Sequence, residues 1–221
     1  MRSFTALALS LLAFVAAPAA AAELVVYETV EVSDAGSERF VATAPAEVPK
    51  GIASFGPFRV LDGTRAALVD VTDEASPAQF EAMLAAYPGI SMIEMIDCPG
   101  TEDDRANLQL GRMIHARGIS THVPAGGSVR SGGVELFLAG KSRRADPGSE
   151  FAVHSWADED GREAKDYPDS APENRAYIAY YEDMGMPEGE AKAFYAMTNS
   201  VPNAEAKWLG AAEMGQWVRL D

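Results

Sequence analysis

Two patterns of hydrophobic residues alternate along this chain, one typical of strands and one typical of helices. Short apolar runs predict strands at 24–32, 58–71, 91–97, 119–124 and 151–156, and the pair Asp62-Gly63 divides the second run into a hairpin. Apolar residues three or four positions apart predict helices at 76–87, 101–117 and 131–139. Strands that alternate with helices in this way indicate an α/β fold.

The second part of the chain has a different pattern. Residues 158–174 are polar and contain prolines, which predicts a surface loop that serves as a lid or a rim. From Arg175 the spacing becomes helical again, over 175–185, 188–198 and 204–217, and predicts a C-terminal helical segment. We expect its aromatic side chains, among them Trp208 and Trp217, to pack on the core or on a neighbouring subunit.

The first 22 residues have the pattern of an export signal. Arg2 precedes an apolar stretch over 4–15, and small residues follow up to Ala22. This stretch is too short to span a bilayer comfortably, and no apolar stretch of about 20 residues follows it. We therefore expect a signal peptide at 1–22, a strand and irregular lead-in at 23–57, a main domain at 58–221, and a mature protein in the periplasm or outside the cell.

Composition and charge disfavour some classes of function and partner. Of the 221 residues, 48% are hydrophobic, which suffices for a packed core. The net charge is −15, and removal of the segment that contains Arg2 makes it one unit more negative, so nucleic acid and membrane partners are not expected. Cys98 is the only cysteine and the three histidines lack metal-binding spacing, so neither a metal nor another cofactor is predicted.

A serine and a histidine supply the candidate chemistry. Ser131-Gly132-Gly133 stands where the chain enters a helix, and His154 follows 23 positions later on a predicted strand. A serine hydroxyl needs a base before it becomes nucleophilic, so this pair favours acyl transfer. The alternative is that Ser131 only caps the helix and His154 is structural. His115 and His122 are interpreted as structural.

These segments resemble the proteolytic subunit of Clp proteases, in the Clp protease and crotonase superfamily, over 66–221. In that family a Ser-Pro-Gly-Gly loop supplies oxyanion donors, and this chain has Cys98-Pro99-Gly100-Thr101 at the matching distance before Ser131. The segments VHSW, DYP, YYEDMGMP and FYAMT are similar to exported bacterial proteins of the same superfamily. The resemblance implies a spiral of ββα units with a C-terminal helical segment, and backbone oxyanion donors at Gly100, Thr101 and Gly132.

The chain departs from the family pattern at the third catalytic position. No aspartate stands where one would orient His154: position 202 is a proline, and Asn203 and Glu205 are the nearest substitutes. Thr101 also replaces a glycine of the loop. Loss of the carboxylate in a serine triad costs on the order of 10⁴ in rate, so slow catalysis is expected.

The sequence therefore predicts a serine hydrolase, peptidase-like or esterase-like, that acts on a peptide or a small acyl substrate. The alternative is a catalytically silent member that binds such a ligand in the same cleft. An acyl-coenzyme A enzyme is disfavoured by the export signal. A Ser/Lys dyad as in signal peptide peptidase A stays open, with the candidate bases Lys141, Lys165 and Lys192. The resemblance also implies a homo-oligomer, a trimer or a larger ring.

Overall fold

The computed structural model describes residues 28–30, 39–41 and 43–221. The predicted signal peptide at 1–22 lies outside the described residues, as does most of the predicted strand at 24–32. The described part of the lead-in contains one antiparallel pair, β1 (Glu28–Val30) and β2 (Arg39–Val41).

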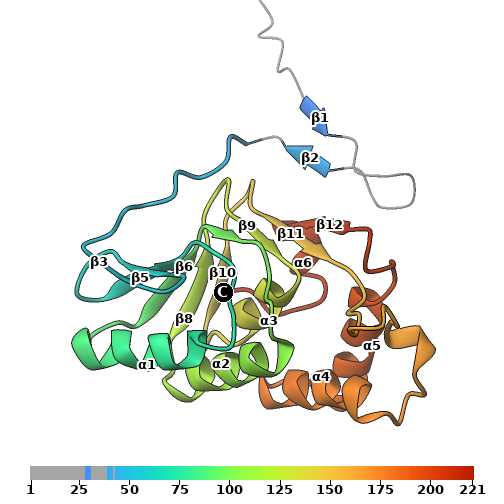
Figure 1. The fold of residues 1–221 in the computed structure, drawn as a ribbon. Helices are drawn as coiled ribbons and strands as arrows, with labels where there is room; N and C mark the ends of the chain where they lie inside the picture. Colours follow the sequence, from blue (N-terminus) through green and yellow to red (C-terminus); the bar gives the residue numbers. More distant parts are fainter. Residues whose placement is uncertain (1–27, 31–38, 42) are drawn as a thin grey trace, which may run out of the picture.

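Two sheets form the centre of the fold (Figure 1). The first has six strands in the order β10-β8-β6-β5-β4-β3. Their bounds are β3 (Ala53–Phe55), β4 (Phe58–Val60), β5 (Arg65–Leu68), β6 (Met92–Met95), β8 (Ser120–Val123) and β10 (Arg143–Ala145). Strands β5, β6, β8 and β10 are parallel, and the β3-β4 hairpin adds an antiparallel edge.

The second sheet has four strands in the order β12-β11-β9-β7. They are β7 (Asp97–Cys98), β9 (Ser128–Arg130), β11 (Glu150–Val153) and β12 (Lys207–Gly210). The first three are parallel, whereas β12 is antiparallel to β11. The chain moves from the first sheet to the second three times, through β6 to β7, β8 to β9 and β10 to β11.

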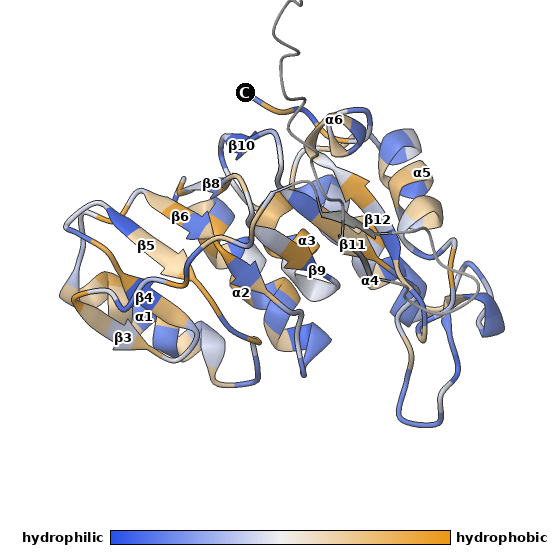
Figure 2. Ribbon diagram, turned by 90° about the horizontal axis from the view of Figure 1, so that it is seen from above, coloured by the Kyte–Doolittle hydropathy of each residue, from blue (hydrophilic) through white to orange (hydrophobic). Residues whose placement is uncertain are grey.

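A helix follows each of these crossings, so the fold repeats a ββα unit. The helices are α1 (Ser76–Ala86), α2 (Asp104–Ala116), α3 (Gly132–Leu138), α4 (Pro172–Asp183), α5 (Glu188–Thr198) and α6 (Ala211–Met214), with a 3-10 turn η1 (Ala164–Asp166). Every residue of α3 is buried, and this largely hydrophobic helix lies in the middle of the molecule (Figure 2). The predicted α/β fold of ββα units is confirmed.

Local signals place most element boundaries correctly. Pro77 begins α1, and the helix ends before Pro88-Gly89. Helix α2 begins later than predicted, because the side chain of Asp103 caps it by accepting a hydrogen bond from the amide of Ala106 at 2.8 Å. Thr101 instead forms an isolated parallel bridge with Thr72.

The predicted helix at 204–217 is wrong. Residues 207–210 form β12 and pair with β11, and only Ala211–Met214 is helical. Without β12, the backbone groups along one edge of β11 would lack hydrogen-bond partners. Pairing with that edge stabilises a strand at 207–210 more than the spacing of its apolar residues stabilises a helix. The C-terminal helical segment consists instead of α4 and α5, with the short α6 after β12. His154 likewise follows β11 rather than lying within it.

Within the part of the chain that the structure describes, no helix combines the length and apolar character needed to cross a bilayer.

Candidate active site

Three neighbouring strands deliver the candidate residues to one edge of the second sheet. Gly100 and Thr101 follow β7, Ser131 follows β9, and His154 follows β11. The three strands are parallel and adjacent, so their carboxyl ends meet. This is the edge at which open α/β sheets bind ligands.

Ser131 has a strained backbone and a hydroxyl that the helix does not use. Its φ is 48° and its ψ is −129°, and it is the one non-glycine residue with a positive φ in the described chain. Such a conformation costs about 1–3 kcal/mol. The side chain makes no capping hydrogen bond to α3, although Ser131 is the N-cap residue. The helix-cap interpretation of its hydroxyl is therefore wrong.

Backbone hydrogen bonds hold Ser131 in this conformation. Its amide donates to the carbonyl of Ala152 on β11 at 2.8 Å, and its carbonyl accepts from the amide of Val134 at 2.9 Å. A sharp strand-to-helix turn of this kind presents a serine hydroxyl outward, as a nucleophile elbow does, although the glycine pattern here is different.

Gly100 packs directly against Ser131. A Cβ at position 100 would lie 3.0 Å from Cβ and 3.4 Å from Oγ of Ser131, and the φ of Gly100 is +132°. Both the contact and the backbone angle require glycine.

Three backbone amides around Ser131 are available as oxyanion donors. In the described chain, the amides of Gly100, Thr101 and Gly132 donate no hydrogen bond that the geometry shows. Gly132 is the first residue of α3, where an amide has no partner within the helix. The carbonyl of Gly100 accepts from the amide of Thr72 at 3.1 Å, and because that peptide is trans, the Thr101 N–H points away from Thr72.

A buried polar bridge fixes these donors relative to one another. The hydroxyl of Thr72 donates to Oδ1 of Asn107 at 2.9 Å, and Nδ2 of Asn107 donates to the carbonyl of Gly132 at 2.7 Å. Thr72 and Asn107 are 1% and 2% exposed. Since buried hydrogen bonds of this kind are costly to break, the loop after β7 and the start of α3 form one rigid frame.

The His154 ring is held at Nδ1. This nitrogen lies 2.9 Å from the carbonyl oxygen of Ser155 and 3.2 Å from Nδ2 of Asn203, which itself donates to the same carbonyl at 2.8 Å. The backbone contact favours the tautomer with the proton on Nδ1. Nε2 then keeps its lone pair, which is the state that a general base requires.

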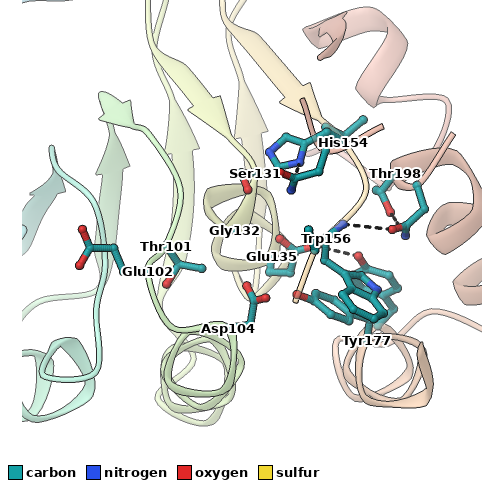
Figure 3. A pocket seen from close by; sticks show the side chains of 15 residues that line it. Thr101, Glu102, Asp104, Ser131, Gly132, Glu135, His154, Trp156, Tyr177 and Thr198 are labelled. Atoms are coloured by element: carbon teal, nitrogen blue, oxygen red, sulfur yellow. Dashed lines mark hydrogen bonds between the residues drawn. The ribbon is translucent and has the colours of Figure 1, made fainter. Parts of the chain in front are cut away.

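Ser131 and His154 line one cavity of about 240 Å³ and lie at the same end of it (Figure 3). Among the described residues, no hydrogen bond joins Oγ of Ser131 to the imidazole. Catalytic hydrogen bonds are often long before a substrate binds. Ser131 and His154 therefore lie in one cavity but are not hydrogen-bonded to each other.

Of the two candidates for the third position, the structure brings Asn203 to His154. Among the described residues Glu205 makes no hydrogen bond to the ring, and its Oε2 is buried without a hydrogen-bond partner. Arg130, which directly precedes Ser131, forms an ion pair with Asp97 at 2.8 Å and does not line the cavity.

The lysines proposed as alternative bases lie elsewhere. Lys165 pairs with Glu163 at 3.1 Å, Lys192 pairs with Glu188 at 2.5 Å, and Lys141 is exposed after α3; none of them lines the cavity. Cys98 is buried, and this burial raises the pKa of its thiol, which disfavours the reactive thiolate.

Sequence reasoning missed the floor of the cavity. Glu135 and Asp104 line it together with the aromatic residues Trp156, Tyr177 and Tyr181. One signal was present: Glu135 is the only charged residue of the otherwise apolar α3, one turn after Ser131. The described residues contain no group of three or more metal-ligating side chains placed to hold an ion.

Comparisons with known proteins give similarity in fold. No family model matches the chain. No curated protein matches it either. Among solved structures, it is similar to a variant of the 1510-N membrane-bound stomatin-specific protease in complex with a substrate peptide, at 17% identity and a TM-score of 0.45, over 69% of this chain and 73% of the other.

A second variant of that protease gives 16% identity and a TM-score of 0.49, over 72% of this chain and 76% of the other. A variant of ClpP1 from Listeria monocytogenes gives 18% identity and a TM-score of 0.46, over 71% of this chain and 88% of the other. At this level the likeness concerns the fold alone. The chemistry of this chain therefore rests on its own geometry.

Proposed function

We propose that this chain is an exported serine hydrolase of the peptidase or esterase type, with Ser131 as nucleophile and His154 as general base. The observation that carries the proposal is the state of Ser131. A strained serine whose hydroxyl does not cap its helix shares a cavity with an imidazole anchored at Nδ1. Strain of this kind is retained where the surrounding structure imposes it, which is common at active sites.

The reaction follows from the arrangement. Nε2 of His154 takes the proton of the Ser131 hydroxyl while Oγ attacks the substrate carbonyl carbon. The resulting oxyanion accepts hydrogen bonds from the Gly132 amide and from the Gly100 and Thr101 loop. The imidazolium then gives its proton to the departing amine or alcohol, which leaves an acyl group on Ser131. Water, deprotonated by the same nitrogen, releases the acid and restores the serine.

Neutral groups replace the usual carboxylate behind the histidine. The carbonyl of Ser155 accepts the Nδ1 proton, and Asn203 donates to that carbonyl, so both fix the orientation of the ring. A carbonyl stabilises an imidazolium less than a carboxylate does. The proposed enzyme is therefore slower than one with a full Ser-His-Asp triad, although the orientation of its His154 ring is maintained.

Labelling with a fluorophosphonate tests this proposal, because the probe reacts with activated serines. We expect the wild type to be labelled, and Ser131→Ala to lose the label. Ser91→Ala is the matched control, since Ser91 is exposed and distant from the cavity; it should be labelled like the wild type. Equal labelling of wild type and Ser131→Ala, or none of either, contradicts the proposal and favours a silent binding protein.

A further inference from the structure

The cavity below Ser131 has acidic and aromatic walls. Ser131 and His154 lie at one end, and Glu135 and Asp104 lie toward the other end, near Trp156 and Tyr177 (Figure 3); Glu135 is buried, whereas Asp104 is exposed. No lysine or arginine is among the described residues that line it. The cavity therefore concentrates negative charge and electron-rich ring faces in a space that no protein cation fills.

Glu135 is almost completely buried, which is unusual for a carboxyl group. Its residue is 6% exposed, and Oε1 accepts a hydrogen bond from the hydroxyl of Tyr181 at 2.7 Å. Tyr181 is the described side chain that donates a hydrogen bond to this carboxyl group. Burial raises the pKa of Glu135 to about 7, and no lysine or arginine among the described residues of the cavity lining offsets its ionised form.

Asp104 adds a second carboxyl group to the same space. It is the first residue of α2, beside Tyr177 of α4; the residue as a whole is exposed, and desolvation of its carboxyl group by the surrounding protein raises its pKa. Its negative charge also raises the pKa of Glu135, so the two carboxyl groups repel each other. A positive charge placed between them would relieve this repulsion and stabilise both ionised forms.

We propose that this end of the cavity is a specificity subsite for a cationic side chain of the lysine type on the acyl side of the scissile bond. This inference rests on the proposed function, because the subsite is defined relative to Ser131. Glu135 is one helical turn beyond Ser131, a rise of about 5–6 Å. A lysine side chain spans about 6 Å from its Cα to its ammonium, so an acyl group on Ser131 brings the charge to Glu135.

The aromatic walls suit the same occupant. Trp156 is held by a hydrogen bond from its Nε1 to the hydroxyl of Tyr195 at 2.7 Å, and Tyr177 packs against Tyr195 with 6.0 Å between ring centroids. Fixed rings cover the methylenes of a lysine stem and attract its ammonium through their faces. Glu135 and Asp104 act in this proposal as residues that determine specificity, whereas Ser131 and His154 perform the reaction.

A matched pair of substrates tests the subsite. The p-nitrophenyl esters of Nα-acetyl-lysine and Nα-acetyl-norleucine have side chains of similar length and differ in the ammonium group. We expect the wild type to prefer the lysine ester by at least about 30-fold in kcat/KM. Glu135→Gln keeps the shape and the acceptor for Tyr181, and it should bring the preference below about threefold. Glu190→Gln, an exposed change on α5, should keep the wild-type preference.

The outcomes separate the subsite from the proposed function. If the wild type hydrolyses norleucine ester as well as lysine ester, the subsite is refuted while the hydrolase stands. If neither ester is hydrolysed and no fluorophosphonate label appears, the proposed function fails. Ligand binding then tests whether the subsite exists. Tryptophan fluorescence, with Trp156 in the wall, then compares Nα-acetyl-lysine amide with Nα-acetyl-norleucine amide. A lysine preference that Glu135→Gln abolishes supports the cationic subsite, and equal or absent binding refutes it.

Discussion

The two sheets each hold one histidine near a carboxyl end, and the two imidazoles are bound in opposite ways. His122 on β8 of the first sheet is 5% exposed. Its Nδ1 lies 2.5 Å from Oε2 of Glu94, and its Nε2 lies 3.0 Å from Oδ2 of Asp146. His154 after β11 of the second sheet is half-buried, and only its Nδ1 has partners.

The surroundings of His122 complete a network of charges. Arg65 lies 3.5 Å from the second oxygen of Glu94. Nη2 of Arg144 lies 3.0 and 3.3 Å from the two ring nitrogens of His122, so the guanidinium lies against the face of the ring. The hydrogen bond to Glu94 raises the pKa of His122 and lowers that of Glu94. The carboxylates at both ring nitrogens therefore favour the protonated form of His122.

The comparison separates the proposed catalytic histidine from a structural one by the contacts that each ring makes. Two carboxylates occupy both nitrogens of His122, so that ring has no lone pair with which to accept a proton from a substrate. The carbonyl of Ser155 holds one nitrogen of His154, and the other nitrogen has no hydrogen-bond partner among the described residues. The number of free nitrogens, rather than position on a strand, distinguishes the two roles.

The largest expected effect comes from removing the free nitrogen. His154→Ala should lower kcat for ester hydrolysis by about 10³-fold or more, near 4 kcal/mol of transition-state free energy, because no other group takes the Ser131 proton. His122→Gln serves as the control and should keep kcat per folded molecule within about threefold. A His154→Ala enzyme with wild-type kcat would remove the distinction between the histidines.

A smaller effect concerns stability, and here we expect the substitution of His122 to have the larger consequence. His122→Gln should lower the free energy of unfolding by about 2 kcal/mol, because Glu94 and Asp146 lose the cation between them while Arg65 and Arg144 still offset part of their charge. Urea denaturation measures this loss. His115→Gln, whose ring makes one contact at 3.2 Å with the carbonyl of Ala139, should cost about 0.5 kcal/mol or less. Equal losses in the two variants would refute the role of the network.

The smallest expected effect is a dependence of that loss on pH. The raised pKa of His122 means that its contribution is complete below the unfolded value of 6.5 and disappears as the pH rises through the folded value. The lowered pKa of Glu94 means that its contribution is present above 4.5 and is lost as the pH falls through the folded value. The stability difference between wild type and His122→Gln should thus be largest between these two pH values and shrink toward pH 8.5. A difference that stays constant from pH 5.5 to 8.5 would contradict the ionic assignment.

Much of the fold was predictable because its signals are local. Proline at the start of α1, Asp62-Gly63 between β4 and β5, and glycine after α2 each restrict a few backbone angles, and the apolar spacing then sets the type of element. The approximate positions of Ser131 and Gly100 were predictable for the same reason, since each lies at a break between a strand and a helix.

Other features depend on partners distant in the chain. The crossing from β6 to β7 within the single apolar run 91–97 has no local signal, and strands β9 and β10 are too short to show a period. The segment at β12 has helical spacing but pairs with β11. Glu135 resembles a solvent-facing position of a short helix until α4 brings Tyr181 over it.

By itself, the sequence determined the α/β alternation, the turns and the chemical types at the candidate positions, because each of these depends on neighbours a few residues apart. Tertiary structure decided which groups meet: Gly100 against Ser131, Asn203 rather than Glu205 at His154, and carboxyl groups at the floor of the cavity. The physical reason is that strand pairing sets these contacts. A parallel sheet aligns the ends of β7, β9 and β11 whatever their separation along the chain, and no local pattern records that alignment.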